Sequence, residues 1–378
     1  MPGRTQSLTL AVLGSSLAFA GCTGGCNGAE ASNTRPADPV AVITVGDRPR
    51  ASEAGDLNGD GLLDLAVANA DSDTLSILLR RPGQALAFDR VDYPAGNEPA
   101  DVDLADYDAD GDLDAAIANH ETSNVTVLLN NGSGVFEPMP GSPFATTARP
   151  HLHGLATGDF TGDGRLDIAA DSSDTDAVTL LAGTAGGFAE AVTLPAGEFP
   201  YYRIAPLVTP GDAVQADRAD LLVPSPRAGE VRRLRTDSAG VSDLIATGQA
   251  AGANVVTPLR LDADGSVGAA VLDSVGLSLW SFEAEGAIRI ARVELDTPHE
   301  ISTGDIDGDG VDEVAVGCWD DSTLRLFASD GRPLGAIPFC HRPASLLLAD
   351  LDGDGGAELV AGCWQEPLLR IHRLGQGR

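Results

Sequence analysis

An Asp-rich turn followed by a short apolar segment recurs seven times along this chain. The turns begin at 45- to 53-residue intervals, at Asp56, Asp106, Asp159, Asp212, Arg260, Asp305 and Asp350. Five copies share one pattern, as in DLNGDGLLD at 56–64, whereas the copies beginning at 212 and 260 are degenerate. A unit of this length cannot bury a core of its own, so neighbouring units must pack against one another. The chain is therefore expected to fold as an array of seven similar units.

Each unit has the pattern of short antiparallel strands. In the first unit, the apolar residues 65–69 are followed by a turn at 70–73 and by an alternating strand at 74–79. A third strand is expected at 89–96, and a fourth directly before the acidic turn. Four such strands in roughly 50 residues form one blade of a β-propeller. No segment has a 3.6-residue apolar period, so we predict an all-β, seven-bladed β-propeller with almost no helix.

The two ends of the repeat array complement each other. The last unit ends after its third strand, and residues 40–45, before the first acidic turn, have the pattern of an outer strand without a blade. We expect this N-terminal strand to pair with the last blade and close the ring. Closure removes the open sheet edges that an unfinished blade would expose.

The first 38 residues lie outside the predicted propeller. Leu8–Ala20 is apolar, follows Arg4 and is too short to span a bilayer, as in a secretory signal peptide over residues 1–21. The segment ends in LAFAGC, which resembles the lipobox of bacterial lipoproteins and implies lipidation of Cys22. An ordinary cleaved signal peptide is the alternative. Residues 22–38 read as a flexible tether before the propeller at 39–378.

The lipobox resemblance also implies a location. The chain is expected to be exported and anchored in a membrane through its lipid. Thr23, rather than Asp, follows Cys22, and lipoprotein sorting patterns then favour the outer membrane or cell surface over the inner membrane.

The charge of the chain excludes several partners and chemistries. Its net charge is −32, with 56 acidic against 24 basic residues, and it contains no lysine. Nucleic acid and anionic membrane surfaces would repel such a protein, so any membrane contact should be through the lipid anchor only. Schiff-base chemistry and a P-loop lysine are excluded. No catalytic motif is present, and we assign the paired carboxylates to the acidic turns, so the chain is not expected to be an enzyme.

The repeat unit resembles a known family. The acidic turn, the apolar strand after it and the prolines upstream (Pro49, Pro99, Pro298 and Pro343) are similar to FG-GAP and VCBS repeats. These repeats build the integrin α-subunit head propeller and many exported bacterial proteins. The resemblance covers residues 39–378, and is specific in five units and weak in the fourth and fifth. It implies that each complete loop binds Ca²⁺ through the side chains at loop positions one, three, five and nine and the main-chain oxygen at position seven.

The implied ligands follow loop by loop. They are Asp56, Asn58, Asp60, Leu62 and Asp64; Asp106, Asp108, Asp110, Asp112 and Asp114; Asp159, Thr161, Asp163, Arg165 and Asp167; Asp305, Asp307, Asp309, Val311 and Glu313; and Asp350, Asp352, Asp354, Gly356 and Glu358. The neutral oxygen of Thr161 should weaken the third site. The fourth and fifth units lack the full set and should be empty, so up to five calcium ions are expected.

Calcium has two rivals as an explanation of these loops. Hard oxygen ligands suit Ca²⁺ better than zinc or copper. An EF-hand needs a bidentate Glu at position twelve, but the twelfth residues are apolar: Val67, Ile117, Ala170, Val316 and Ala361. Metal-free turns closed by Asp side chains are the remaining alternative. Carboxylates so close together repel unless a cation lies between them, so we expect the ions to be structural.

The face opposite the acidic loops carries most of the aromatic and imidazole side chains. The candidate binding residues are Trp319, Trp364, His299, His341, Arg342, Tyr201, Tyr202 and His151, with Asn69, Asn119, His120, Arg149, His153, Asp171 and Phe199 at equivalent ends of strands. Exposed aromatics beside arginine are typical of binding hot spots. Alternatively, the two GCW turns are duplicates whose indoles cap the core.

The cysteines of the last two units predict one disulfide. Cys318, Cys340 and Cys363 are an odd number, so one bridge plus one free thiol is expected, with Cys340 in the bridge. A Cys/His metal site is the less favoured alternative. His151 and His153 lie on one side of an extended segment, but two ligands alone are weak evidence for a metal.

The sequence predicts an exported, monomeric, calcium-binding propeller that acts as a binding, adhesion or scaffold module for a protein or glycan ligand. Two alternatives stay open. One is a polysaccharide lyase or hydrolase whose site lies on the face opposite the calcium loops. The other is a purely structural component of the cell envelope.

Overall fold

The computed structural model describes residues 38–147, 151–172, 175–208, 218–236, 242–283 and 286–374. The predicted signal peptide and nearly all of the tether, including Cys22, lie outside these ranges. The described residues form β-strands and turns and contain no α-helix, so none of them forms a helix that could cross a membrane. The expectation of an all-β fold is confirmed.

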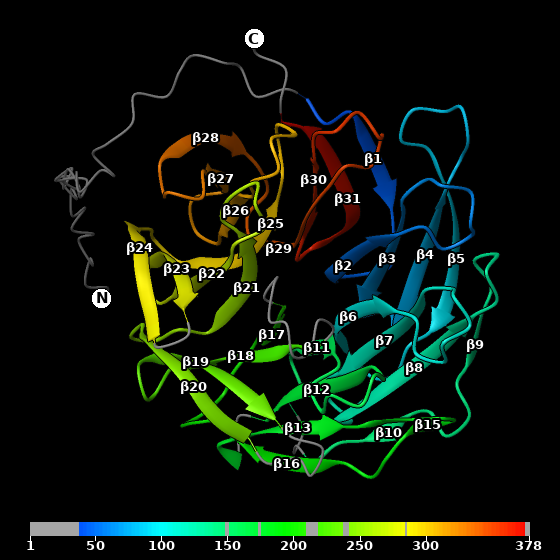
Figure 1. Ribbon diagram of the computed structural model, residues 1–378. Helices are drawn as coiled ribbons and strands as arrows, with labels where there is room; N and C mark the ends of the chain where they lie inside the picture. The colour runs from blue at the N-terminus through cyan, green and yellow to red at the C-terminus, as the bar shows by residue number, and fades with distance from the viewer. Residues whose placement is uncertain are drawn as a thin grey trace, which may run out of the picture. The chain divides into compact units, whose positions relative to one another are not determined.

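Seven antiparallel sheets form the blades (Figure 1). Six of them have four strands, and the sheet of blade two has five. Blade one holds β2 (Pro49–Gly55), β3 (Asp64–Asn69), β4 (Thr74–Arg80) and β5 (Phe88–Pro94). Blade two holds β6 (Pro99–Ala105), β7 (Asp114–Asn119) and β8 (Asn124–Asn130), with β9 (Phe136–Pro138) and β10 (Phe144–Ala145) both paired to β8. Blade three holds β11 (Leu155–Gly158), β12 (Asp167–Ser172), β13 (Ala177–Leu181) and β16 (Val192–Pro195), beside a hairpin of β14 (Gly183–Thr184) and β15 (Gly187–Phe188).

The remaining blades follow the same order. Blade four holds β17 (Ala205–Leu207), β18 (Asp220–Ser225), β19 (Glu230–Thr236) and β20 (Ser242–Gln249). Blade five holds β21 (Val255–Arg260), β22 (Val267–Asp273), β23 (Gly276–Glu283) and β24 (Gly286–Glu294). Blade six holds β25 (Pro298–Gly304), β26 (Glu313–Cys318), β27 (Thr323–Phe327) and β28 (Pro333–Pro338). Blade seven holds β29 (Pro343–Ala349), β30 (Glu358–Cys363), β31 (Glu366–Arg373) and, from the other end of the chain, β1 (Ala41–Thr44).

The N-terminal strand closes the ring, as the sequence predicts. β1 runs antiparallel to β31, with Ala41 opposite Ile371. Hydrogen bonds extend the pairing at both ends, from Val40 N to Ile371 O (2.8 Å) and from Val45 N to Pro367 O (2.9 Å). The first strand of each blade contacts the first strand of the next around the whole circle, and β29 contacts β2 across the closure (Figure 1).

The core lies between neighbouring blades. The second strands β3, β7, β12, β18, β26 and β30 are buried along their whole length. Position two of each complete acidic loop also enters the core, through Leu57, Tyr107, Phe160, Ile306 and Leu351, all at most 9% exposed. Burying one such side chain contributes roughly 1.5–3 kcal/mol. Each complete acidic loop is therefore anchored to the apolar interior by its own side chain, without a bound ion.

A β-bulge recurs where four first strands begin. The pairing register shifts after Pro49, Pro99, Pro298 and Pro343, so the next residue in each strand is left unpaired. Bulges often re-aim a side chain beside a functional site. In blades one and six, the extra residues are Arg50 and His299, at the end of the blade opposite the acidic loop.

The expected disulfide is confirmed. Cys340 and Cys363 are bonded, with their Cα atoms 6.2 Å apart. Cys318 is a buried free thiol, and burial raises its pKa to about 12. A metal site built on these cysteines is therefore not formed.

Candidate functional site

The acidic loops cluster at one end of the strands, between the first and second strand of each blade. In the first loop, Asp56 accepts hydrogen bonds from the main-chain N–H groups of Gly59 (2.8 Å) and Gly61 (2.9 Å). Asp64, at position nine, accepts from Leu57 N (3.0 Å) and Arg80 N (2.6 Å). The glycine at position six has a positive φ in all five complete loops, namely Gly61, Gly111, Gly164, Gly310 and Gly355. Each loop is therefore a closed turn with its carboxylates on the inner side.

Positions one, three and nine converge where all three are acidic. In loops two, six and seven, one oxygen from each position lies within 4.8 Å of the others; the residues are Asp106, Asp108 and Asp114; Asp305, Asp307 and Glu313; and Asp350, Asp352 and Glu358. In loops one and three, position three is the neutral Asn58 or Thr161. In all five complete loops the position-five carboxylate accepts from the position-seven N–H, as Asp60 does from Leu62 (2.9 Å).

These donor sets fit a divalent cation. Burial, with a smaller addition from neighbouring carboxylates, raises the pKa of Asp64 and of Asp114 to about 6. The same causes raise the pKa of Glu313 to about 7. In loop seven, Oδ1 of Asp352 is buried and has no hydrogen-bond partner. Buried carboxylates that lack compensating charge are the condition that a bound cation relieves.

The fourth and fifth units replace this chemistry with arginine. Asp220, which begins β18 as Asp64 begins β3, is bound by Nε of Arg233 and Nε of Arg235, both at 2.6 Å. In unit five, Arg260 pairs with Asp312 of the next loop (2.9 Å). Asp212 and Asp217 lie outside the described residues. Protein cations at these positions support the expectation that the two sites hold no metal.

A chain of aromatic rings lies at the opposite ends of the strands. We call it the aromatic face and define it as His120, His151, His153, Phe199, Tyr201, Tyr202, His299, Trp319 and Trp364. All of these residues precede a first strand, follow a second strand or occupy the bulge, so they come from blades two, three, four, six and seven.

The rings touch one another in a row that runs from blade two to blade seven and omits blade five. His153 contacts His120 and Tyr201, with ring centroids 4.8 and 4.7 Å apart. Tyr202 contacts His299 (5.3 Å), which stacks on Trp319 at 3.7 Å. Trp319 then meets Trp364 edge to face at 5.8 Å. Aromatic pairs in these arrangements gain about 0.5–1.5 kcal/mol beyond the area that they bury.

Charged side chains complete a closed circuit. The Arg48 guanidinium lies 4.9 Å from the Trp364 ring centroid and 2.5 Å from Glu98 Oε1. Glu98 Oε2 in turn lies 3.4 Å from His120 Nδ1. Burial alone would raise the pKa of Glu98, but Arg48 holds it below its usual range. The circuit passes through blades one, two, three, four, six and seven, so all of these blades contribute to one surface.

The structure assigns different surroundings to the predicted face residues. Arg342 lies 5.2 Å from the Trp319 ring centroid, whereas His341 is exposed and contacts no ring of the aromatic face. Asn69 and Asn119 are fully buried, and Asn69 accepts from Gly46 N (3.0 Å). Arg149 lies outside the described residues. Trp319 and Trp364 are half-buried, so their rings are not enclosed in the core as simple caps.

Four carboxylates correct the interpretation that all paired acids belong to calcium loops. Glu53, Asp101, Asp103 and Glu300 lie on the first strands β2, β6 and β25, between the acidic loops and the aromatic face. That part of the sequence interpretation was wrong. The signal was present in the segments SEAG, DVDLA and EISTG, where acids interrupt strands that pack at the centre of the ring.

These inner carboxylates are linked to the aromatic face. The Tyr202 hydroxyl donates to Glu300 Oε1 (2.7 Å), and His299 Nδ1 lies 3.0 Å from the same oxygen. Arg203 reaches Asp101 (3.6 Å). Burial and, to a smaller extent, the nearby carboxylate of Asp103 raise the pKa of Glu53 to about 8. Burial likewise raises the pKa values of Asp101 and Asp103. At neutral pH, Glu53 is therefore largely protonated next to the aromatic face.

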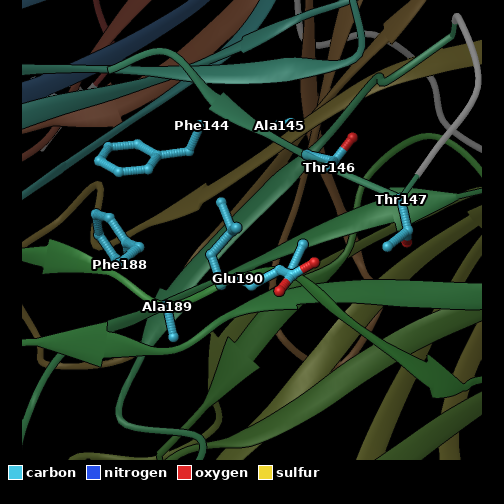
Figure 2. Close-up of a pocket in the computed structure, with 9 residues that line it drawn as sticks. Phe144, Ala145, Thr146, Thr147, Phe188, Ala189 and Glu190 are labelled. Atoms are coloured by element: carbon cyan, nitrogen blue, oxygen red, sulfur yellow. The ribbon is translucent and has the colours of Figure 1, made fainter. Parts of the chain in front are cut away.

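A shallow pocket of about 320 Å³ lies at the outer edge of blades two and three, and none of its lining residues belongs to the aromatic face. Figure 2 shows Phe144 and Phe188 side by side on its wall, and their ring centroids are 5.1 Å apart. Glu190 is the single charged residue among its lining side chains. Because its one carboxylate has no second titratable group beside it in the lining, this pocket is a weaker candidate site than the aromatic face.

The sequence comparison identifies the repeat. Residues 56–117 and 106–170 each match the model of the FG-GAP-like repeat. No curated protein matches the chain in sequence. The matched segments span loops one, two and three, which are three of the five complete copies.

Solved structures share the fold at low identity. The BBS1N domain from a complex with ARL6DN is 14% identical, covering 91% of this chain and 97% of that chain with a TM-score of 0.62. Virginiamycin B lyase from Staphylococcus aureus is 10% identical, covering 89% and 99%, with a TM-score of 0.58. The Swd1 β-propeller domain from Myceliophteria thermophila is 12% identical, covering 90% and 100%, with a TM-score of 0.59. These likenesses concern the fold alone.

Proposed function

Because the chain is a seven-bladed β-propeller whose residues 56–170 match FG-GAP-like repeats, we propose that it is a calcium-stabilised binding module exported to the cell envelope. The observation that carries the proposal is the circuit of rings and charges on one face. It joins residues from six blades through contacts such as His299 with Trp319 (3.7 Å) and Arg48 with Glu98 (2.5 Å). Such a surface forms only when the whole ring is closed.

The two faces have separate tasks in this proposal. Calcium bound in the acidic loops would supply positive charge between Asp106, Asp108 and Asp114 and their counterparts. The side chain at position two of each loop is buried in the core between blades, so an ion bound in the loop would hold the loop in place against that core. The opposite face stays free of metal-loop residues and presents half-buried indoles, imidazoles and arginines. Rigid aromatic side chains of this kind bind with little loss of conformational entropy.

The ligand is a protein or a glycan. Flat, half-buried rings such as Trp319 and Trp364 can pack against apolar side chains or against the faces of sugar rings. Arg48, Arg342 and Glu98 add directional hydrogen bonds at the edge of the rings. The net charge of −32 argues against nucleic acid.

A binding screen tests this function. The purified protein would be applied to a glycan array and used in a pull-down from envelope extracts, in calcium and in chelator. Trp319→Ala and Trp364→Ala should each weaken binding by at least tenfold, about 1.4 kcal/mol or more. His341→Ala, on the same face but outside the circuit, is the matched control. Binding that is indifferent to both tryptophan substitutions would place the ligand elsewhere.

Export and anchoring are part of the proposal and rest on the N-terminal sequence. Leu8–Ala20 and Cys22 support a lipoprotein signal. Cys22→Ser should release the protein from the membrane fraction, while a wild-type protein that is already soluble would indicate an ordinary signal peptide.

A polysaccharide lyase or hydrolase is the second candidate function, and the inner carboxylates favour it. Glu53, with its pKa raised to about 8, could hold a proton for a leaving group at neutral pH. Tyr202 and His299 share Glu300 within 3.0 Å. One structural neighbour is itself named a lyase. If the protein cleaves a polysaccharide, Glu53→Gln and Tyr202→Phe should abolish product formation. Glu53→Gln, which changes no residue of the aromatic face, should leave binding intact.

A further inference from the structure

Two segments beside the aromatic face bring two imidazoles and a carboxylate together. His120 and Glu121 follow β7, and His151 belongs to the connection that leads to β11. One ligand atom from each of the three residues lies within 4.8 Å of the others. His120 Nε2 and His151 Nδ1 are 3.1 Å apart. Two nitrogens bound to one tetrahedral zinc at about 2.0 Å would be roughly 3.3 Å apart.

Main-chain hydrogen bonds fix these segments relative to one another. His151 N donates to His120 O (2.7 Å), His120 N donates to Glu98 O (3.1 Å), and Glu121 N donates to Asn97 O (3.4 Å). His151 has a φ of 108°, which is unfavourable for a residue with a side chain. Backbone strain of this kind persists where the surrounding structure holds it, and it is frequent at functional sites.

His120 and the neighbouring His153 each have a carboxylate beside Nδ1. Nδ1 of His120, the ring nitrogen away from His151, lies 3.4 Å from Glu98 Oε2 and 3.3 Å from Glu121 Oε1, and Glu98 is held by Arg48. The neighbouring His153 has its Nδ1 3.3 Å from Asp171 Oδ2. A carboxylate next to one ring nitrogen of a histidine fixes the tautomer, so the other ring nitrogen is free to bind a metal. This is the usual arrangement of metal-binding histidines.

We propose that His120 and His151, with Glu121, form a site for a divalent transition metal of the zinc class on the aromatic face. Imidazole ligands distinguish this site from the acidic loops, whose oxygen ligands select calcium. Two nitrogens and one carboxylate oxygen leave a fourth position for water or for a donor atom of a bound ligand. The site does not depend on the binding function proposed above, because it uses its own ligand atoms.

Zinc titration of the purified protein in excess calcium tests the site. The calcium keeps the acidic loops occupied, so that Zn²⁺ reports on the imidazoles. We expect one equivalent of zinc by calorimetry, and Co²⁺ in its place should give the visible absorption of a nitrogen-coordinated ion. His120→Ala and His151→Ala should each weaken zinc binding by at least about tenfold, the loss that follows even when only a ligand's partner is removed.

His151 is exposed, so its substitution should leave the fold and calcium binding unchanged. Glu121→Gln should weaken zinc less than loss of either histidine. His341→Ala is the matched control, because it removes an exposed imidazole from the same face outside the cluster. The absence of zinc binding, equal affinity in His151→Ala, or an equal loss in His341→Ala would each overturn the proposal. In those cases the 3.1 Å contact is an ordinary hydrogen bond between two histidines.

Discussion

The segment 40–45, which contains β1, offers a sharp test of ring closure because one of its valines is buried and another is exposed. Val45 is 3% exposed and packs with Leu65, Val360 and Leu369 where blades seven and one meet. Val42 is 54% exposed on the same segment. If β1 closes the ring as described, Val45→Ala should destabilise the whole propeller and Val42→Ala should not.

The size of the effect follows from the burial of Val45. Its replacement by alanine removes two buried carbon groups, about 1.6 kcal/mol at about 0.8 kcal/mol each. The cavity left behind raises the loss to about 2–3 kcal/mol. The exposed Val42 should change the free energy of unfolding by no more than about 0.5 kcal/mol. At about 2 °C per kcal/mol for a domain of this size, the two variants should differ by roughly 4–6 °C in Tm.

Thermal unfolding followed by circular dichroism, in excess calcium, measures this difference. Hydrogen exchange at the amides of β1 and β31 provides a local readout, and Val45→Ala should speed exchange in both strands. Deletion of residues 39–47 should cost more than either substitution, since it exposes the edge of β31. Equal melting temperatures for the two valine variants, or an unchanged Tm after the deletion, would refute closure by β1.

Three further outcomes follow from the structure. Removal of calcium by a chelator should lower the free energy of unfolding by about 3 kcal/mol for each loop that calcium occupies at a hundredfold excess over its Kd. Calorimetry should detect no more than five bound ions, and a calcium titration without heat would contradict the prediction. Cys340→Ser should lower the free energy of unfolding by roughly 3–4 kcal/mol, because the disulfide closes a loop with a sequence separation of 23; Cys318→Ala, which removes the free thiol, is the control for loss of a buried sulfur. Finally, the pKa of Glu53 is raised in the folded state to about 8 from 4.5. The stability that protonated Glu53 contributes is therefore complete below pH 4.5 and is lost as the pH rises through 8. Between these pH values, the free energy of unfolding of the wild type should fall by up to about 1.4 kcal/mol per pH unit more than that of Glu53→Gln, as measured by urea unfolding.

Much of the fold could be predicted because its information is local. The loop at 56–64 and its copies carry the turn, the glycine and the first residue of the second strand within nine positions. Counting copies therefore counts blades, and the missing outer strand of the last unit indicates the role of residues 40–45. The odd number of cysteines, with Cys340 between two equivalent positions, predicts the bridge for the same local reason.

The candidate site was predictable only in part. Strand polarity places Trp319, Trp364 and Tyr202 at the ends opposite the acidic loops, because each falls just before a first strand or just after a second. Strand polarity does not reveal that His120 lies against Glu98 or that His299 stacks on Trp319. The bulge after Pro298 turns His299 towards the rings, and a bulge is not visible in a pattern of alternating residues.

The sequence by itself determined the repeat, the number of blades, the acidic loops and the end of the blades on which the aromatics lie. These depend on spacing within one unit. Only the tertiary structure decided which side chains from different blades meet, such as Tyr202 with Glu300, 98 residues apart, or Ser52 with Ser345, 293 residues apart. Such contacts depend on the rotation from blade to blade and on closure of the ring, which place residues distant in the chain around one axis. The inner carboxylates and the His120–His151 pair belong to this second class.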